Sequence, residues 1–252
     1  MKSVFVSGTA GSGKALLTAK LRDYYTRNGA FAAVLNLDAG VESLPYTCDV
    51  DVRDHVDLAT IMHQYGLGPN GSLIMASDLI ASKIGEIQEE VDDVNPDYLI
   101  VDTPGQVELF AYRSSGGYVV DSLSSDEKTS IFLFDGALIT TPVNFVSIAL
   151  LATSIRLRLG LPAINAVTKT DLIGPKIKEI LGWSTSLSSL ENAIAAESDG
   201  ETYTLITGVL RGLNVGGFAQ GLIPVSNVTG DGLVNLEGAL SRILNRGEEI
   251  ED

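Results

Sequence analysis

The sequence predicts an α/β protein built on a mostly parallel, doubly wound sheet flanked by helices. Short apolar runs rich in β-branched residues alternate with longer helical stretches along the 252 residues. This alternation is typical of a parallel sheet covered by helices on both faces. A glycine-rich loop directly follows the first apolar run, and polar motifs follow several of the later ones. We therefore expect one domain over residues 1–252, with functional residues at the carboxyl ends of the strands.

The apolar runs define the expected strands, at residues 3–7, 31–37, 97–102, 130–135, 163–169 and 221–226. A helix is expected at 14–28 after the glycine-rich loop. A long apolar helix at 142–159 is expected to be capped around Thr141, with Pro142 in its first turn. This helix is interpreted as core, with a dimer seam or partner groove as the alternative. The last helix is expected from about Gly232 to Asn245.

Two insertions separate these elements. Residues 52–94 are too long for a simple crossover and indicate two helices broken at "GLGPNGS", residues 66–72. Residues 175–218 indicate a second helical insertion made of several short helices. The tail "RGEEIED", residues 246–252, is expected to fray.

Composition excludes several classes of function. The formal charge of −15, from 32 acidic and 17 basic residues, offers no basic surface for nucleic acid or anionic lipid. A single cysteine, Cys48, allows no internal disulfide, and no Cys/His zinc spacing is present. The apolar stretch 143–155 ends at Arg156, short of the ~20 residues that a bilayer requires. We expect a cytoplasmic protein without a direct nucleic-acid or membrane partner.

The stretch "GTAGSGKAL" lies between a predicted strand and a predicted helix, and its residues are predicted to hold nucleotide phosphates. Glycines allow successive backbone N–H groups to point at phosphate oxygens, and the helix N-terminus adds a positive dipole. Lys14 is expected to bridge the outer phosphates. The predicted binding residues are Gly8, Thr9, Ala10, Gly11, Ser12, Gly13, Lys14, Ala15 and Leu16.

The motif "VDTPGQVE" follows the third predicted strand, so Asp102 is expected to hold a metal-bound water beside the phosphates. Gly105 is expected to donate its backbone N–H to a terminal phosphate. The strand 163–169 ends in "TKTD", where the carboxylate of Asp171 can accept hydrogen bonds from the N1–H and exocyclic amine of guanine. Lys169 can lay its aliphatic stem along the base.

The remaining base contacts are expected from Thr168 and from "SNV", Ser226, Asn227 and Val228, after the last strand. In the order of these motifs the sequence is similar to guanine-nucleotide-binding domains. The tripeptide Gly68-Pro69-Asn70 resembles the signature insertion of the GPN-loop GTPases, and "NLDAG" (36–40) and "DTPGQVELF" (102–110) resemble the neighbouring motifs of that family. The compact length is most like the archaeal members.

The resemblance implies a nucleotide-switched homodimer that hydrolyses GTP to GDP and phosphate with Mg²⁺. It implies that Gly68, Pro69 and Asn70 act at the partner's nucleotide, and that a client or assembly partner binds according to the nucleotide state. Asp38 would be the metal-side acidic residue, and together with Asp102 it would hold the metal through water. Gln106 and Glu108 would help to place the attacking water.

Ala15 departs from that family, whose phosphate loop carries Ser or Thr at this position. A methyl group cannot replace a hydroxyl ligand to magnesium, so turnover is expected to be impaired. One alternative is a nucleotide-gated binding or assembly module with negligible hydrolysis. Another is an ATP-using small-molecule enzyme on the same dimeric fold, which Asp171 disfavours.

Five other residues are interpreted structurally. His55 and His63 are expected on one helix in surface or packing roles, and Cys48 is expected as a small buried hydrophobe. Arg53 and Arg113 are expected to pair with nearby acids, with a charge-neutralising finger as the alternative.

Overall fold

The computed structural model describes residues 1–197, 199–214 and 221–245. Within these ranges the strands form one sheet in the order β3-β2-β4-β1-β5-β6-β7, and every pairing is parallel. The sheet is therefore wholly parallel rather than mostly parallel. Its strands are β1 (Lys2–Gly8), β2 (Ala32–Asn36), β3 (Val50–Asp51), β4 (Tyr98–Asp102), β5 (Glu127–Asp135), β6 (Ala163–Thr168) and β7 (Ile223–Pro224).

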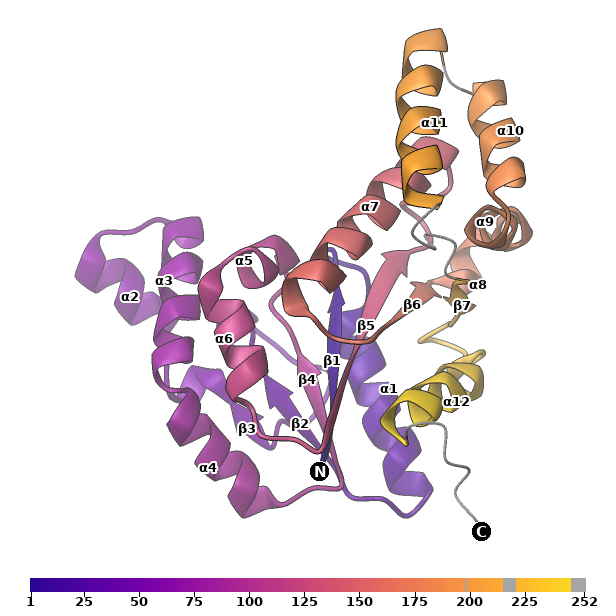
Figure 1. The fold of residues 1–252 in the computed structure, drawn as a ribbon. Helices are drawn as coiled ribbons and strands as arrows, with labels where there is room; N and C mark the ends of the chain where they lie inside the picture. Colours follow the sequence, from indigo (N-terminus) through magenta and orange to yellow (C-terminus); the bar gives the residue numbers. More distant parts are fainter. Residues whose placement is uncertain (198, 215–220, 246–252) are drawn as a thin grey trace.

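Helices cover both faces of this sheet (Figure 1). On β1, Val4 and Val6 point into one core cluster with α1 (Lys14–Arg27) and α12 (Leu233–Leu244), whereas Phe5 points into the other. The same alternation holds along β2, β4 and β5, as expected for side chains that leave a strand on alternate faces. The doubly wound arrangement is confirmed.

The second face is covered by helices from the middle of the chain. The first insertion contains a short 3₁₀ helix, η1 (Val52–Asp54), and the helices α2 (Leu58–Tyr65), α3 (Pro69–Ser82) and α4 (Ile84–Val94). The prediction of two helices was wrong, because the helical conformation is interrupted a second time at Lys83, between α3 and α4. The break predicted at 66–72 is shorter in the structure, where residues 66–68 connect α2 to α3. Pro69 begins α3, because its fixed φ suits the first turn of a helix.

Two short helices follow β4, α5 (Val107–Ala111) and α6 (Ser114–Ser122). The long helix α7 (Pro142–Leu159) begins as predicted: the Thr141 hydroxyl accepts a hydrogen bond from the Asn144 N–H at 3.4 Å, and Pro142 occupies the first turn. Among the described residues, α7 is the one helix with the length and composition to cross a membrane. A stripe along it is buried against the protein, and Phe145 contacts Phe134 of β5 with ring centroids 6.2 Å apart.

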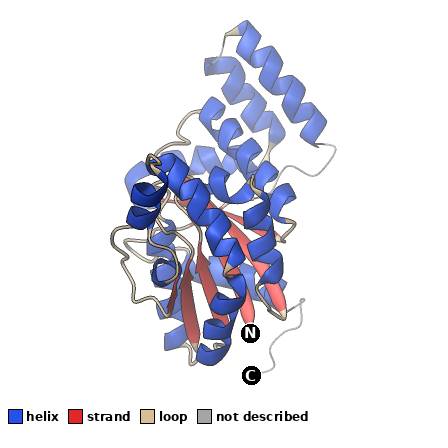
Figure 2. Cartoon of the chain, turned by 90° about the vertical axis from the view of Figure 1, so that its left-hand side faces the viewer, coloured by secondary structure: helices blue, strands red, loops and turns tan. Residues whose placement is uncertain are grey.

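The second insertion contains α8 (Thr170–Ile173), α9 (Lys176–Thr185), α10 (Leu187–Glu197) and α11 (Gly200–Asn214). In Figure 1, α10 and α11 project beyond the sheet, and Figure 2 shows the same projection from the side. The last strand is shorter than its predicted range 221–226. The end of the insertion, within 215–220, and the predicted frayed tail, 246–252, lie outside the described residues.

Candidate nucleotide site

The phosphate loop turns from β1 into α1 through glycines with positive φ. Gly8, Gly11 and Gly13 have φ values of 150°, 75° and 91°. A Cβ at Gly8 would lie 2.7 Å from the Ser12 Oγ, so a larger residue does not fit there. The N-cap of α1 is Gly13, which offers no side-chain cap. The first N–H groups of the helix are therefore available to an anion.

Lys14 begins α1 and is buried inside this loop. Its Nζ donates to the carbonyl oxygens of Gly8 and Thr9, at 3.0 Å each, and to that of Gly105 at 3.4 Å. Burial lowers the pKa of Lys14, and the nearby charges of Asp102, Asp38 and Glu108 oppose this effect. The ammonium thus joins the phosphate loop to the "DTPG" loop after β4.

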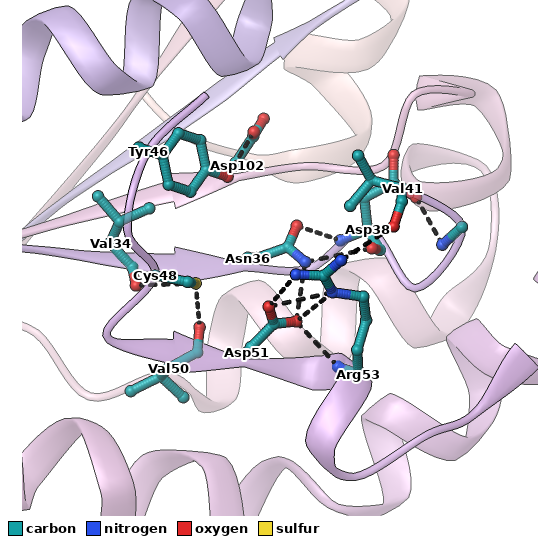
Figure 3. Close-up of polar contacts among 11 residues, drawn as sticks. Val34, Asn36, Asp38, Val41, Tyr46, Cys48, Val50, Asp51, Arg53 and Asp102 are labelled. Carbon is teal, nitrogen blue, oxygen red and sulfur yellow. Dashed lines mark hydrogen bonds and ion pairs between the residues drawn. The ribbon is translucent and has the colours of Figure 1, made fainter. Parts of the chain in front are cut away.

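Asp102 ends β4 and is almost completely buried. Its Oδ2 accepts a hydrogen bond from the Tyr46 hydroxyl at 2.7 Å (Figure 3). Burial raises the pKa of Asp102 to about 6, although Tyr46 and Lys14 both favour the carboxylate. This carboxylate has a neighbouring cation but loses much of its hydration, so a bound metal ion would stabilise its charged form.

Asp38 follows β2 and contacts the loop after β4. Its Oδ1 accepts from the Gly40 N–H at 2.9 Å, and its Oδ2 accepts from the Gly105 N–H at 2.8 Å. The Gly105 amide is thus bonded to Asp38 in this structure, whereas the sequence predicts that it is open to a terminal phosphate. The physical reason is that the Asp38 carboxylate lies close enough to satisfy this half-buried amide.

Ala15 lies in a pocket of about 260 Å³ between these groups. Its methyl group offers no oxygen, and the charged oxygen donors suited to Mg²⁺ in this pocket are the carboxylates of Asp38 and Asp102. The described residues contain no group of three or more His, Cys, Asp or Glu that could hold a metal ion alone. The site fits an ion that takes its other oxygens from phosphate and water. The pocket is lined by Gly11, Gly13, Lys14, Ala15, Leu16, Asp38, Val41, Leu44, Asp102, Thr103 and Gly105.

Side chains from the motifs predicted to recognise the base bond to the phosphate loop. The buried Thr168 hydroxyl donates to the Ser12 carbonyl at 2.7 Å, and the Asn227 amide donates to the Gly13 carbonyl at 3.1 Å. The Asn227 Oδ1 and the Ser12 Oγ are buried without a protein partner. These two oxygens are polar groups that a bound nucleotide or water can satisfy.

Asp171 lies in the first turn of α8, where its Oδ1 accepts from the Ser226 hydroxyl at 2.6 Å. Lys169 has a left-handed backbone with φ of 58°, and its Nζ bonds to the Asp135 Oδ2 at 2.7 Å. The two base motifs after β6 and β7 are therefore in contact. Val228 next to them is 75% exposed.

The tripeptide Gly68-Pro69-Asn70 does not line the chain's own phosphate pocket. It is exposed at the junction of α2 and α3, where Gly68 is the N-cap of α3. Gln106 and Glu108 are exposed at the start of α5, beside the "DTPG" loop. The pocket next to Gln106 is lined instead by the middle of α3, including Leu73, Ala76, Ser77 and Ile80.

The residues expected to have packing or pairing roles, rather than roles in the site, are placed as follows. Arg53 pairs with Asp51, and Arg113 pairs with Asp78, at 2.6 and 2.7 Å. The half-buried Cys48 donates to the Val50 carbonyl at 2.9 Å. The prediction that His55 and His63 share a helix was wrong: His63 lies in α2, but His55 follows η1 and its Nε2 lies 3.0 Å from Glu90.

Sequence reasoning missed the side chains that hold the acidic residues. Tyr46 contacts Asp102, and the buried Asn36 contacts the backbone of Asp38. Asn36 belongs to the quoted "NLDAG" motif, so its position next to Asp38 was an available signal. Nothing in the sequence around Tyr46 distinguishes it from an ordinary loop tyrosine.

Comparison with known proteins identifies the family. A family model described as "Conserved hypothetical ATP binding protein" matches residues 6–246. GPN-loop GTPase PAB0955 of Pyrococcus abyssi is 36% identical over 178 residues, which cover 70% of this chain and 70% of that protein. GPN-loop GTPase 1 of Dictyostelium discoideum is 33% identical over 195 residues, and this chain spans 49% of its length.

The fold comparison agrees with the sequence comparison. The crystal structure of PAB0955, a GTPase in apo form from Pyrococcus abyssi, matches with a TM-score of 0.80 and 27% identity. The match covers 96% of this chain and 97% of that one. This chain's glycine-rich loop, "DTPG" loop and predicted base motifs thus lie on a fold that it shares with this GTPase. The chain belongs to the GPN-loop GTPases.

Proposed function

We propose that this chain binds GTP and hydrolyses it to GDP and phosphate, as a homodimer in the cytoplasm whose binding of a client or assembly partner follows the nucleotide state. The observation that carries the proposal is the buried Lys14. Its ammonium lies between the phosphate loop and the Gly105 carbonyl, in a pocket that also contains Asp38 and Asp102. This arrangement suits a phosphate chain with a bound cation.

The roles of the residues follow from their chemistry. The backbone N–H groups of the phosphate loop and Lys14 bind the phosphates, while Asp171 selects guanine. Asp38 and Asp102 would hold Mg²⁺, directly or through water. When bound, this ion supplies positive charge that neutralises the charge developing on the phosphates. The hydrolysis itself needs positioned water more than a strong base.

Gln106 and Glu108 are proposed to orient that water, because they are exposed at the start of α5 next to Gly105. Gly68, Pro69 and Asn70 are proposed to act at the partner protomer's nucleotide. Their exposed position outside the chain's own pocket supports a contact made in trans.

A second candidate is a binding module with negligible hydrolysis, and Ala15 is the observation that favours it. The pocket retains its phosphate donors but lacks a hydroxyl at this position. An ATP-using enzyme, in line with the description of the family model, is disfavoured because the Asp171 carboxylate would face the N1 acceptor of adenine.

The test combines nucleotide competition with phosphate release. GTP, ATP and XTP compete against a fluorescent GDP analogue, and phosphate release is followed at saturating GTP with Mg²⁺. Preference for GTP with measurable release supports the proposal. Preference for GTP without release supports the binding module, whereas preference for ATP contradicts the guanine assignment. Asp171→Asn should shift preference from GTP toward XTP, because xanthine carries an oxygen where guanine has its amine.

A further inference from the structure

A network of polar side chains is bonded to the backbone of Asp38 (Figure 3). The Asp38 carboxylate, by contrast, contacts Gly105. Asn36, the last residue of β2, is completely buried. Its Oδ1 accepts from the Asp38 N–H at 3.0 Å, and its Nδ2 donates to the Asp38 carbonyl at 3.2 Å. The Asn36 amide therefore fixes both backbone polar groups of Asp38.

Asp51 in turn fixes Asn36. The Asp51 Oδ1 accepts a second hydrogen bond from the Asn36 Nδ2, at 2.9 Å. Because Asp51 lies in the short edge strand β3, this contact joins two adjacent strands at their carboxyl ends. An amide with these three contacts has a defined orientation.

Arg53 holds the carboxylate of Asp51. Its Nε lies 3.0 and 3.1 Å from the two Asp51 oxygens, and its Nη2 lies 2.6 Å from Oδ2. Burial alone would raise the pKa of Asp51, but the hydrogen bonds from Arg53 and Asn36 lower it. The remaining guanidinium nitrogen, Nη1, donates to the Val41 carbonyl at 3.1 Å. Arg53 thus contacts the loop of Asp38 from its far end.

We propose that Arg53 and Asp51 are positioning residues for Asp38, so that they set the affinity of the site for a divalent cation without touching nucleotide. The inference rests on the proposed function, in which Asp38 faces Mg²⁺. Asn36 fixes the backbone at one end of residues 38–41 and Arg53 fixes the other. The Asp38 carboxylate is therefore held toward Gly105 by groups of the protein itself, and outer-shell contacts of this kind orient metal ligands.

The first measurement is a Mg²⁺ titration of the binding of a fluorescent, non-hydrolysable GTP analogue. Arg53→Ala and Asp51→Asn should raise the Mg²⁺ midpoint by about 10-fold, the scale on which outer-shell contacts affect metal affinity. Affinity without Mg²⁺ should change by less than about 2-fold, because the altered groups share no partner with the phosphate or base contacts. Arg53→Lys keeps the charge but not the planar fork, so its midpoint should lie between those of the wild type and Arg53→Ala.

The second measurement needs no nucleotide. Amide hydrogen exchange of the peptides that contain Gly40 and Gly105 should be faster in Arg53→Ala and Asp51→Asn than in the wild type, because both amides donate to Asp38. Arg113→Ala is the matched control: it removes another arginine–aspartate pair, at 2.7 Å, that is absent from this network. It should change neither exchange in these peptides nor the Mg²⁺ midpoint.

The outcomes separate this inference from the proposed function. Absence of guanine-nucleotide binding by the wild type contradicts the proposed function, while the exchange experiment still tests whether Arg53 positions Asp38. Unchanged exchange and an unchanged Mg²⁺ midpoint overturn the positioning role. Slower turnover at an unchanged midpoint also overturns it, and instead assigns Arg53 to charge stabilisation at the reaction centre. If Arg53→Ala does not fold, Arg53→Lys and Asp51→Asn give the same comparison.

Discussion

Ala15 occupies the position at which we expect a Ser or Thr in the phosphate loop. It follows Lys14 at the start of α1 and lines the pocket that contains Asp38 and Asp102. Its methyl group leaves the phosphate-binding backbone intact. The expected defect is therefore in the binding of magnesium, which requires near-octahedral oxygen ligands.

Ala15→Ser should raise turnover by about 10-fold, because one added metal ligand can restore more than ~1 kcal/mol of transition-state stabilisation. The Mg²⁺ midpoint should fall in parallel. Phosphate release at saturating GTP is measured across a magnesium titration for both proteins. Equal rates and equal midpoints would show that Ala15 does not limit the reaction.

Cys48 gives a prediction that depends on pH. Burial, together with the charges of Asp51 and Asp49, raises the pKa of its thiol to about 11, and the backbone hydrogen bonds only partly oppose this. Since the thiolate is the nucleophile, alkylation by iodoacetamide should rise about 10-fold per pH unit between about pH 7 and pH 9.5. In denaturant the rate should level off above about pH 9, since a free thiol has a pKa near 8.5. A plateau below pH 9 in the native protein would contradict the raised pKa.

The contacts of individual residues show how much of the site could be predicted from the sequence. The strand-end motifs were sufficient to place Lys14 and Asp102 together, because the carboxyl ends of parallel strands share one edge, whereas Asp38 was expected there only from the resemblance to the GPN-loop GTPases. They were not sufficient to show that Thr168 bonds to the phosphate loop or that Tyr46 bonds to Asp102. Those contacts depend on loop conformations that no periodic pattern encodes.

At the scale of elements, the predicted strands and long helices agree with the structure to within about three residues at each end. The strand β3 was missed because its two residues, Val50 and Asp51, are too few for an alternating pattern. The helices α5 and α6 were missed for a similar reason, since each is short and α6 contains two consecutive glycines. Long amphipathic or buried segments are predictable, and short elements are held mainly by tertiary contacts.

One of those glycines is required by packing. A Cβ on Gly116 of α6 would lie 1.9 Å from the Phe110 carbonyl oxygen of α5, whereas a Cβ on the adjacent Gly117 meets no atom within 4 Å. Gly116→Ala should therefore destabilise the protein by about 3 kcal/mol. Gly117→Ala should be neutral or stabilise it by up to ~1 kcal/mol through helix propensity.

Urea unfolding of the nucleotide-free variants measures this difference. Similar unfolding free energies for the two alanine variants would mean that α5 and α6 do not pack as closely as the structure places them. The comparison matters for the site because α5 begins next to Gln106, so its packing against α6 positions the proposed water-binding residues.

At the scale of the whole molecule, the nucleotide pocket and the GPN tripeptide lie on separate parts of one chain. Residues of the tripeptide are exposed at the α2–α3 junction. A two-fold dimer would allow each protomer to supply this loop to the other. Pro69 stiffens the loop, and Asn70 offers both an amide and a carbonyl group.

If each nucleotide site contains residues of both protomers, mixing two impaired variants should restore GTP hydrolysis. We expect Asn70→Ala and Gln106→Ala, each made with Ala15→Ser, to hydrolyse GTP slowly alone and faster when mixed, because a heterodimer contains one intact composite site. Phosphate release checks the mixture, and light scattering with nucleotide checks the dimer. A monomer under these conditions, or no gain on mixing, would contradict action in trans.

The contact between Asp38 and Gly105 also affects how the protein distinguishes its two nucleotides. The amide that a terminal phosphate would use already bonds to an anion of the protein. If the γ-phosphate of GTP takes this amide, as we propose, its binding would exchange one anion for another and would release the Asp38 carboxylate. GDP lacks the γ-phosphate and would leave the contact between Asp38 and Gly105 in place. The same amide would in this way couple the arrival of the third phosphate to the availability of a negatively charged oxygen for a cation.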